Sequence, residues 1–163
     1  DLRNASLNVE ALASSILVSN QLETINLDGT PLPVKQLKGD HAVSELSFAS
    51  CGPRSVVLIC ELASVNSSLR SLDLHGAQFD ADSCNAVVKA ARASHLEHLT
   101  VEDFALPIQA LNGSLAVSTL NFRHSKLGYP SVLVIGELIS TNSTLARLDL
   151  SYNSLGPNGG AAL

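Results

Sequence analysis

One apolar pattern, Leu-x-x-Leu-x-Leu with other apolar residues allowed at each place, recurs along the chain and limits what it can fold into. Six such triplets are present, and residues 1–2 resemble the tail of a seventh. Their third members, counted from Leu2, are spaced by 25, 21, 26, 27, 21 and 28 residues. The triplets are Leu22, Ile25, Leu27; Val43, Leu46, Phe48; Leu69, Leu72, Leu74; Leu96, Leu99, Val101; Val117, Leu120, Phe122; and Leu145, Leu148, Leu150. Such a period indicates an array of structural repeats.

A longer duplication overlies this period. Segment 22–68 matches segment 96–144, most clearly where LPVKQLKG at 32–39 stands against LPIQALNG at 106–113, 74 residues later. After the first copy, Cys51-Gly52-Pro53 lacks two residues relative to 125–130. The pattern predicts an array built by duplicating a block of three repeats.

Alternation within each triplet predicts a short strand whose apolar side chains point inward. Residues 53–65, 81–93 and 130–140 carry apolar residues at three and four spacing, which predicts helices. Pro53 and Pro130 suit a first helical turn, and Asp80 or Asp82 suits an N-cap. The two 21-residue repeats leave space for a single helical turn at 33–37 and 107–111.

The segment LDLSYNSLGPNGGAAL at 148–163 resembles the ribonuclease-inhibitor-like class of leucine-rich repeat. The resemblance implies an α/β solenoid, a right-handed superhelix with one parallel sheet on the concave face and helices and short turns on the convex face. We expect residues 1–163 to form a single array of about six to seven repeats, incomplete at both ends. Repeats without polar caps leave apolar ends, so self-association is also expected.

The resemblance further implies a buried ladder at the position three residues after each triplet, where Asn or Cys bonds the backbone of neighbouring turns. Cys51 and Asn153 follow this consensus. Thr30, Ala77, Phe104 and Ser125 stand at the other equivalent positions. We therefore expect a ladder weaker than usual.

Polar residues between the triplet apolar positions would line the concave face. Since neighbouring strands lie about 4.8 Å apart, His75, Glu102 and Arg123 are predicted to form one row. The row predicted beside it contains Asp73, Thr100, Asn121 and Asp149. The candidate protein-binding residues are Asp73, His75, His98, Thr100, Glu102, Asn121, Arg123 and Asp149.

Metal binding and catalysis are the alternatives for this patch. Asp73, His75 and Glu102 carry ligand chemistry, and a histidine beside a carboxylate could move protons. However, His98 would lie about 13 Å along its strand from Glu102, so the two histidines do not converge. No repeat position brings a histidine to Cys51. We expect no metal, no cofactor and no enzymatic activity.

Charge and cysteine usage limit the partners and the compartment. The net charge is -5 and the ten Lys and Arg residues are scattered, which argues against nucleic acid. The apolar runs at 56–60 and 132–135 are too short to span a membrane. Three cysteines without metal-ligand spacing favour free thiols in the cytoplasm. Secretion is the alternative, because Asn-x-Ser/Thr sequons occur at Asn4, Asn66, Asn112 and Asn142.

These features predict a non-catalytic module that binds a protein through the concave sheet face. The expected face lacks Trp and Tyr, which dominate tight interfaces, so a weaker interaction is expected. The resemblance also permits a GTPase-activating regulator. A purely structural segment of a longer array is the third possibility.

Overall fold

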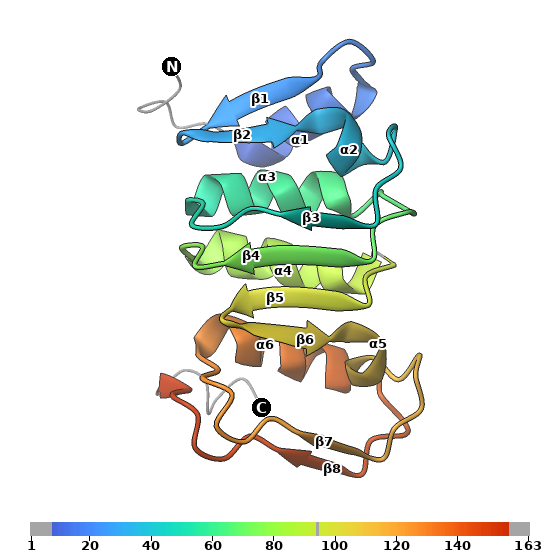
Figure 1. The fold of residues 1–163 in the computed structure, drawn as a ribbon, viewed down its shortest axis with the longest axis vertical. Coiled ribbons are helices and arrows are strands. Elements are labelled where there is room, and N and C mark those ends of the chain that lie inside the picture. The colour runs from blue at the N-terminus through green and yellow to red at the C-terminus, as the bar shows by residue number, and fades with distance from the viewer. Residues whose placement is uncertain (1–7, 94, 157–163) are drawn as a thin grey trace.

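The chain folds into layers of short strands and helices, described by a computed structural model for residues 8–93 and 95–156. In these described ranges, eight strands lie one below another along the long axis, with the longer helices behind them (Figure 1). This is an α/β repeat fold. The predicted repeat tail at 1–2, the sequon at Asn4 and the last part of the final repeat lie outside the described residues.

Each of the six apolar triplets contributes a strand, as predicted. The strands are β1 (Thr24–Leu27), β3 (Glu45–Ser47), β4 (Ser71–His75), β5 (His98–Glu102), β7 (Thr119–Asn121) and β8 (Arg147–Asp149). In β4 and β5, Leu72, Leu74, Leu99 and Val101 are fully buried, and the residues between them are more exposed.

The predicted helices of the long repeats are confirmed as α3 (Pro53–Ala63), α4 (Ala81–Ala93) and α6 (Tyr129–Ile139). Proline stands in the first turn of α3 and α6, where its missing N–H costs no helical bond. Asp80 precedes α4, and its Oδ1 accepts a 2.9 Å bond from the Ser83 N–H. This bond is the main reason that the pKa of Asp80 is lowered.

Single turns replace these helices in the short repeats, also as predicted. They are α2 (Val34–Lys38) and α5 (Ile108–Leu111). A further helix, α1 (Val9–Val18), was not foreseen; Asn8 caps it by accepting a 3.0 Å bond from the Ala11 N–H. Helices α1, α3, α4 and α6 cover the inner face of the strands (Figure 1).

The prediction of one continuous parallel sheet is wrong. Two unforeseen strands, β2 (Thr30–Pro33) and β6 (Phe104–Pro107), pair antiparallel with β1 and β5. The described strands form three sheets: β1-β2, β3-β4-β5-β6 and β7-β8. Leu99 and Leu120, expected in one sheet, therefore lie in separate sheets.

The hairpin turns explain why the sheet divides. Leu27 pairs with Thr30 across Asp28 and Gly29, whose φ angles are 54° and 83°. Positive φ at both turn residues is the geometry of a tight two-residue hairpin, for which Asp-Gly is favoured. The chain thus reverses beside its own strand. It occupies the place that the next triplet would take in a parallel sheet.

Prolines then close the outer edge of each hairpin. Leu27 and Thr30 are the hydrogen-bonded pair that closes the turn, and hydrogen-bonded and non-hydrogen-bonded pairs alternate from there. Pro31 and Pro33 are therefore at non-hydrogen-bonded positions, so their backbone nitrogens face the edge of β2 that is turned away from β1. Pro107 holds the same place in β6 as Pro33 in β2. Proline has no N–H to give to a neighbouring strand, so pairing of β2 with β3, or of β6 with β7, is weakened.

The duplication predicted from the sequence is visible in the elements. β2 and β6 match at a spacing of 74 residues, as do β3 and β7. From α3 and α6 onward the spacing becomes 76. The two-residue difference falls at the position where Cys51-Gly52-Pro53 is shorter than its counterpart.

Candidate interaction surface

The outward side of β3, β4 and β5 is the broadest parallel surface in the described chain. Ser47 lies beside Asp73 and Asp73 beside Thr100, while Ser71 lies beside His98. We call this surface the strand face. It comprises Glu45, Ser47, Ser71, Asp73, His75, His98 and Thr100. Glu45, Ser47, His75 and His98 are exposed, and the other three are half-buried. The surface is polar, and its carboxylates are those of Glu45 and Asp73.

Several candidate binding residues accept hydrogen bonds from the backbone at the end of a strand or just after it. Asp73 Oδ1 accepts a 2.9 Å bond from the His75 N–H, and its Oδ2 accepts one of 2.9 Å from Ser47 Oγ. Asn121 Oδ1 likewise accepts from the Arg123 N–H at 3.0 Å. These polar atoms are partly engaged within the fold, and they fix the direction in which His75 and Arg123 leave the strands.

Asp149 repeats this arrangement in β8. Its Oδ1 accepts from Ser151 Oγ at 2.6 Å and from the Ser151 N–H at 3.0 Å. These bonds are the largest causes of the lowered pKa of Asp149, and the nearby charges of Arg123 and Arg147 lower it further. Asn121 and Asp149 lie side by side in the β7-β8 sheet.

Glu102 does not face outward with the other candidates. Its φ of 60° accompanies a side chain that reaches the start of α6. There Oε2 accepts bonds from the Gly128 N–H at 2.8 Å and from Ser131 Oγ at 2.6 Å. A carboxylate stabilises the unpaired N–H groups at a helix N-terminus. Glu102 Oε2 therefore stabilises the start of the helix, and a contact of Glu102 with a partner stays a prediction.

Replacing Gly128 by alanine tests this contact. A Cβ at Gly128 would overlap Glu102 Oε1, whereas one at the equivalent Gly52 would meet Asp28 Oδ2 at an ordinary 3.4 Å. We expect Gly128→Ala to lower the free energy of unfolding by about 1–3 kcal/mol, because the carboxylate must leave its donors. Gly52→Ala should change it by less than about 0.5 kcal/mol. Urea denaturation measures both, and equal effects would argue against the role of Glu102.

The predicted row of His75, Glu102 and Arg123 is also wrong in its last member. His75 pairs with Glu102 across β4 and β5, but β6 lies on the other side of β5, where Thr100 pairs with Ala105. Arg123 follows β7, in the separate sheet. The carboxylate beside His75 Nδ1 is instead Asp103, with Oδ1 at 3.2 Å.

Arg123 lies in a second group of side chains at the β7-β8 end. Its guanidinium carbon lies 4.2 Å from the centre of the Tyr152 ring. The His124 ring lies 4.6 Å from the same ring. Tyr152 is not among the residues predicted from the sequence, because it follows β8 and is not one of the alternating strand positions.

Two equivalent asparagines join neighbouring repeats. Asn66 Nδ2 donates to the carbonyls of Gln36 and Leu37 at 2.8 and 3.2 Å, and Asn142 Nδ2 donates to those of Ala110 and Leu111, both at 2.9 Å. The amide nitrogen that a glycan would need is thus engaged in both. Their equivalence is visible in the sequence, since both residues stand three positions before a triplet.

Cys51 and Asn153, the two consensus ladder residues, each bond the backbone of a neighbouring repeat. Asn153 Nδ2 donates to the Phe122 carbonyl at 2.7 Å, and its Oδ1 accepts from the Leu127 N–H at 3.1 Å. Cys51 is buried, and its carbonyl accepts from the Gln78 N–H at 2.9 Å.

The three cysteines are free and buried. Burial raises the pKa of the Cys51 and Cys60 thiols, and it is the main reason that the pKa of Cys84 rises to about 11. Within the described ranges, no group of three or more His, Cys, Asp or Glu side chains could hold a metal ion. No helix among the described residues has the length and apolar character needed to cross a membrane.

A cleft of about 630 Å³ opens on the helical side, between α1, α3 and α4. Its lining includes Val9, Val57 and Ala86, with Arg54 and Asp82 among the charged residues. The cleft was not foreseen, because its walls come from three helices, one of which was not predicted.

The Leucine Rich repeat family matches residues 141–163. The match supports a leucine-rich repeat protein. Within the described residues it covers Asn142, the last apolar triplet, β8 and Asn153. In this leucine-rich repeat the triplet supplies the strand, and the two asparagines bond the preceding repeat. No curated protein matches the chain.

Proposed function

We propose that the chain is a non-catalytic interaction module that binds a protein partner through the strand face. The observation that carries the proposal is the parallel register of β3, β4 and β5, which places their polar side chains side by side. Leucine-rich repeats are commonly used for protein recognition, and the family match agrees with this use. We also propose that the repeats are of the ribonuclease-inhibitor-like class. The support for this is that the long repeats alternate a strand with a helix of 11 to 13 residues.

Rigidity supports this use of the face. Asp73 is bonded to Ser47 and to the His75 N–H, so the side chains of β3 and β4 are held before a partner arrives. Leu72 and Leu99 anchor the same strands in the core. A surface that is already ordered loses less conformational entropy on binding. Glu45 and His98, both exposed, are the best placed for direct contact.

Site-specific photo-crosslinking in cells tests the proposal. A photoreactive amino acid at His98 should give covalent adducts with a protein partner, whereas the same group at Asn85, exposed on α4, should not. Adding Glu45→Lys should reduce the His98 adduct, because the charge that faces the partner is reversed. Adducts from Asn85 but none from His98 would place the interaction on the helical side and contradict the proposal.

A further inference from the structure

The positive charges of the chain are not used evenly. Five of the described Lys and Arg residues form ion pairs within 4 Å: Lys35, Lys38, Arg70, Lys89 and Arg92. Among the described residues, Arg54, Arg123, Lys126 and Arg147 have no such pair. Three of these four follow residue 120. Cations that are not neutralised by the fold gather near its C-terminal strands.

Charge balance along the chain sharpens this contrast. Residues 8–116 contain six Lys or Arg and twelve Asp or Glu, whereas residues 117–156 contain three and two. Of those last two acids, Glu137 pairs with Arg92 at 3.0 Å. Asp149 lies near both Arg123 and Arg147, and its acceptors are partly engaged by Ser151. The β7-β8 end is therefore a basic region on an acidic molecule.

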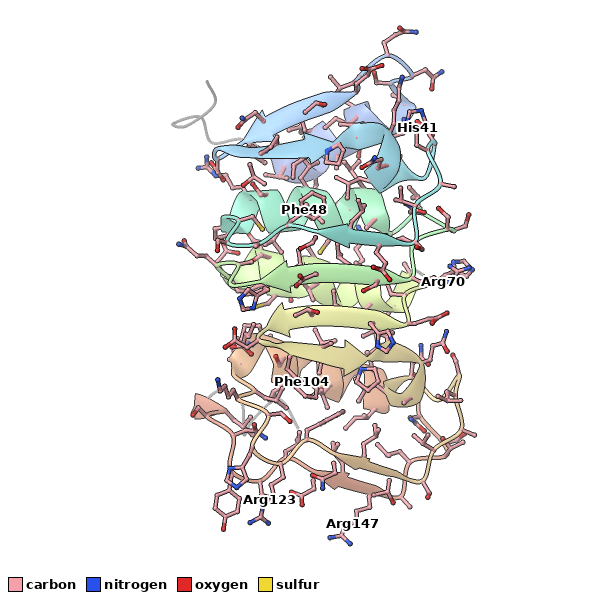
Figure 2. All side chains as sticks on the ribbon, viewed as in Figure 1. His41, Phe48, Arg70, Phe104, Arg123 and Arg147 are labelled. Atoms are coloured by element: carbon pink, nitrogen blue, oxygen red, sulfur yellow. The ribbon has the colours of Figure 1, made fainter. Side chains whose placement is uncertain are left out.

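The side chains of this region are also ordered. Arg123 stacks on Tyr152 at 4.2 Å, and His124 packs on the same ring. Asn121 accepts from the Arg123 N–H and fixes the backbone there. Tyr152 nevertheless remains 67% exposed. Figure 2 shows Arg123 and Arg147 both projecting away from the ribbon at this end.

We propose that Arg123, Arg147 and Tyr152 form a binding site for an acidic segment of a protein partner. The guanidinium group matches a carboxylate through paired charge-assisted hydrogen bonds. Arginine and tyrosine are the residue types that most often carry binding energy at interfaces, and stacking already orders one arginine here. The net charge of -5 disfavours a nucleic acid, whose binding needs many phosphate contacts.

This inference rests on the proposed function, because it names the chemistry of the partner and a second contact beyond the strand face. The two surfaces are distinct. The β6 strand lies between β5 and β7 (Figure 1), so a partner that binds both surfaces must cross β6.

Binding of a fluorescent peptide made of glutamate and leucine tests the site, with a matched peptide in which lysine replaces every glutamate. We expect the chain to bind the acidic peptide more tightly, and added salt to weaken that binding. The double substitution Arg123→Gln and Arg147→Gln should raise the Kd for the acidic peptide by about tenfold or more. Tyr152→Ala should raise it less, since it removes the stacking support and no charge.

Arg54→Gln is the matched control, because Arg54 also lacks an ion pair but lines the cleft on the helical side. It should leave the Kd unchanged. A Kd raised equally by Arg54→Gln, or equal binding of the two peptides, would overturn the site. An acidic part of a second copy of the chain could instead occupy Arg123. Sedimentation would then show self-association, and the double substitution would abolish it. That result would overturn the assignment to a different protein partner. If the peptide experiment fails in one of these ways but His98 still crosslinks to a protein, the proposed function is retained and only the acidic-segment site is rejected.

Discussion

Replacing Asn66 by alanine is expected to lower the free energy of unfolding by about 3 kcal/mol or more. The side chain is 1% exposed and donates to two carbonyls of the preceding repeat. Its Oδ1 also accepts from the Ser68 N–H, from Ser68 Oγ and from the Leu69 N–H. Alanine leaves these groups without a partner where water has little access. Urea denaturation followed by circular dichroism measures the loss.

Two other sequon asparagines provide the controls. Asn142 makes the equivalent bonds but is half-buried, so Asn142→Ala should cost less, about 1–2 kcal/mol. Asn112 accepts a bond from the Ser114 N–H near the surface, and its substitution should cost less than about 1 kcal/mol. The expected order is Asn66, then Asn142, then Asn112. If Asn66→Ala lowers the free energy of unfolding no more than Asn112→Ala does, the hydrogen bonds of Asn66 do not stabilise the contact between repeats.

Leu72→Ala is expected to have a comparable effect, lowering the free energy of unfolding by about 3–4 kcal/mol. Leu72 is fully buried in β4, between β3 and β5. Close packing on both sides prevents the neighbours from filling the space that the leucine leaves. The substitution combines lost burial with a cavity. Chemical denaturation reports the change.

The same triplet position in other repeats gives a graded control. Leu46 in β3 and Leu120 in β7 are half-buried, because the hairpin strands interrupt the sheet beside them. Their replacement by alanine should cost about 1–2 kcal/mol each. In a continuous sheet all three positions would be equally enclosed, so equal losses at Leu72, Leu46 and Leu120 would contradict the observed division of the sheet.

The apolar pattern was sufficient to predict the six triplet strands and most of the helices, but not β2 and β6. Leu72 and Leu74 alternate with polar residues, and α3 and α4 have apolar residues at helical spacing, so each element could be placed from local chemistry. The long duplication was equally visible, because LPVKQLKG and LPIQALNG preserve the residues that form the same turn and helix.

The hairpins were not predicted, because the family resemblance implies a single parallel sheet, in which no strand folds back on the one before it. Asp28-Gly29 between Leu27 and Thr30 is a hairpin signal in its own right. The second hairpin is harder to predict, since Glu102-Asp103 contains no glycine, although Glu102 still adopts a φ of 60°.

The candidate surface was only partly predictable for the same reason. Strand alternation correctly placed Asp73, Thr100 and His98 on one side, because it depends on neighbours within the chain. The place of Arg123 depended on which strand lies next to β5, which alternation does not determine. Glu102 ends β5 and Tyr152 follows β8, and a left-handed φ of 60° at each residue redirects the chain there.

Proton NMR on the folded chain tests most directly that the hairpin strand β6 divides the interaction surface in two. Thr100 and Ala105 face each other as an antiparallel pair that is not hydrogen-bonded, an arrangement that brings the two Cα atoms to about 4.5 Å. We predict a strong nuclear Overhauser effect between their Hα protons. If that signal is absent and effects instead link Thr100 with Asn121, then β5 and β7 are parallel neighbours and the division of the surface is contradicted.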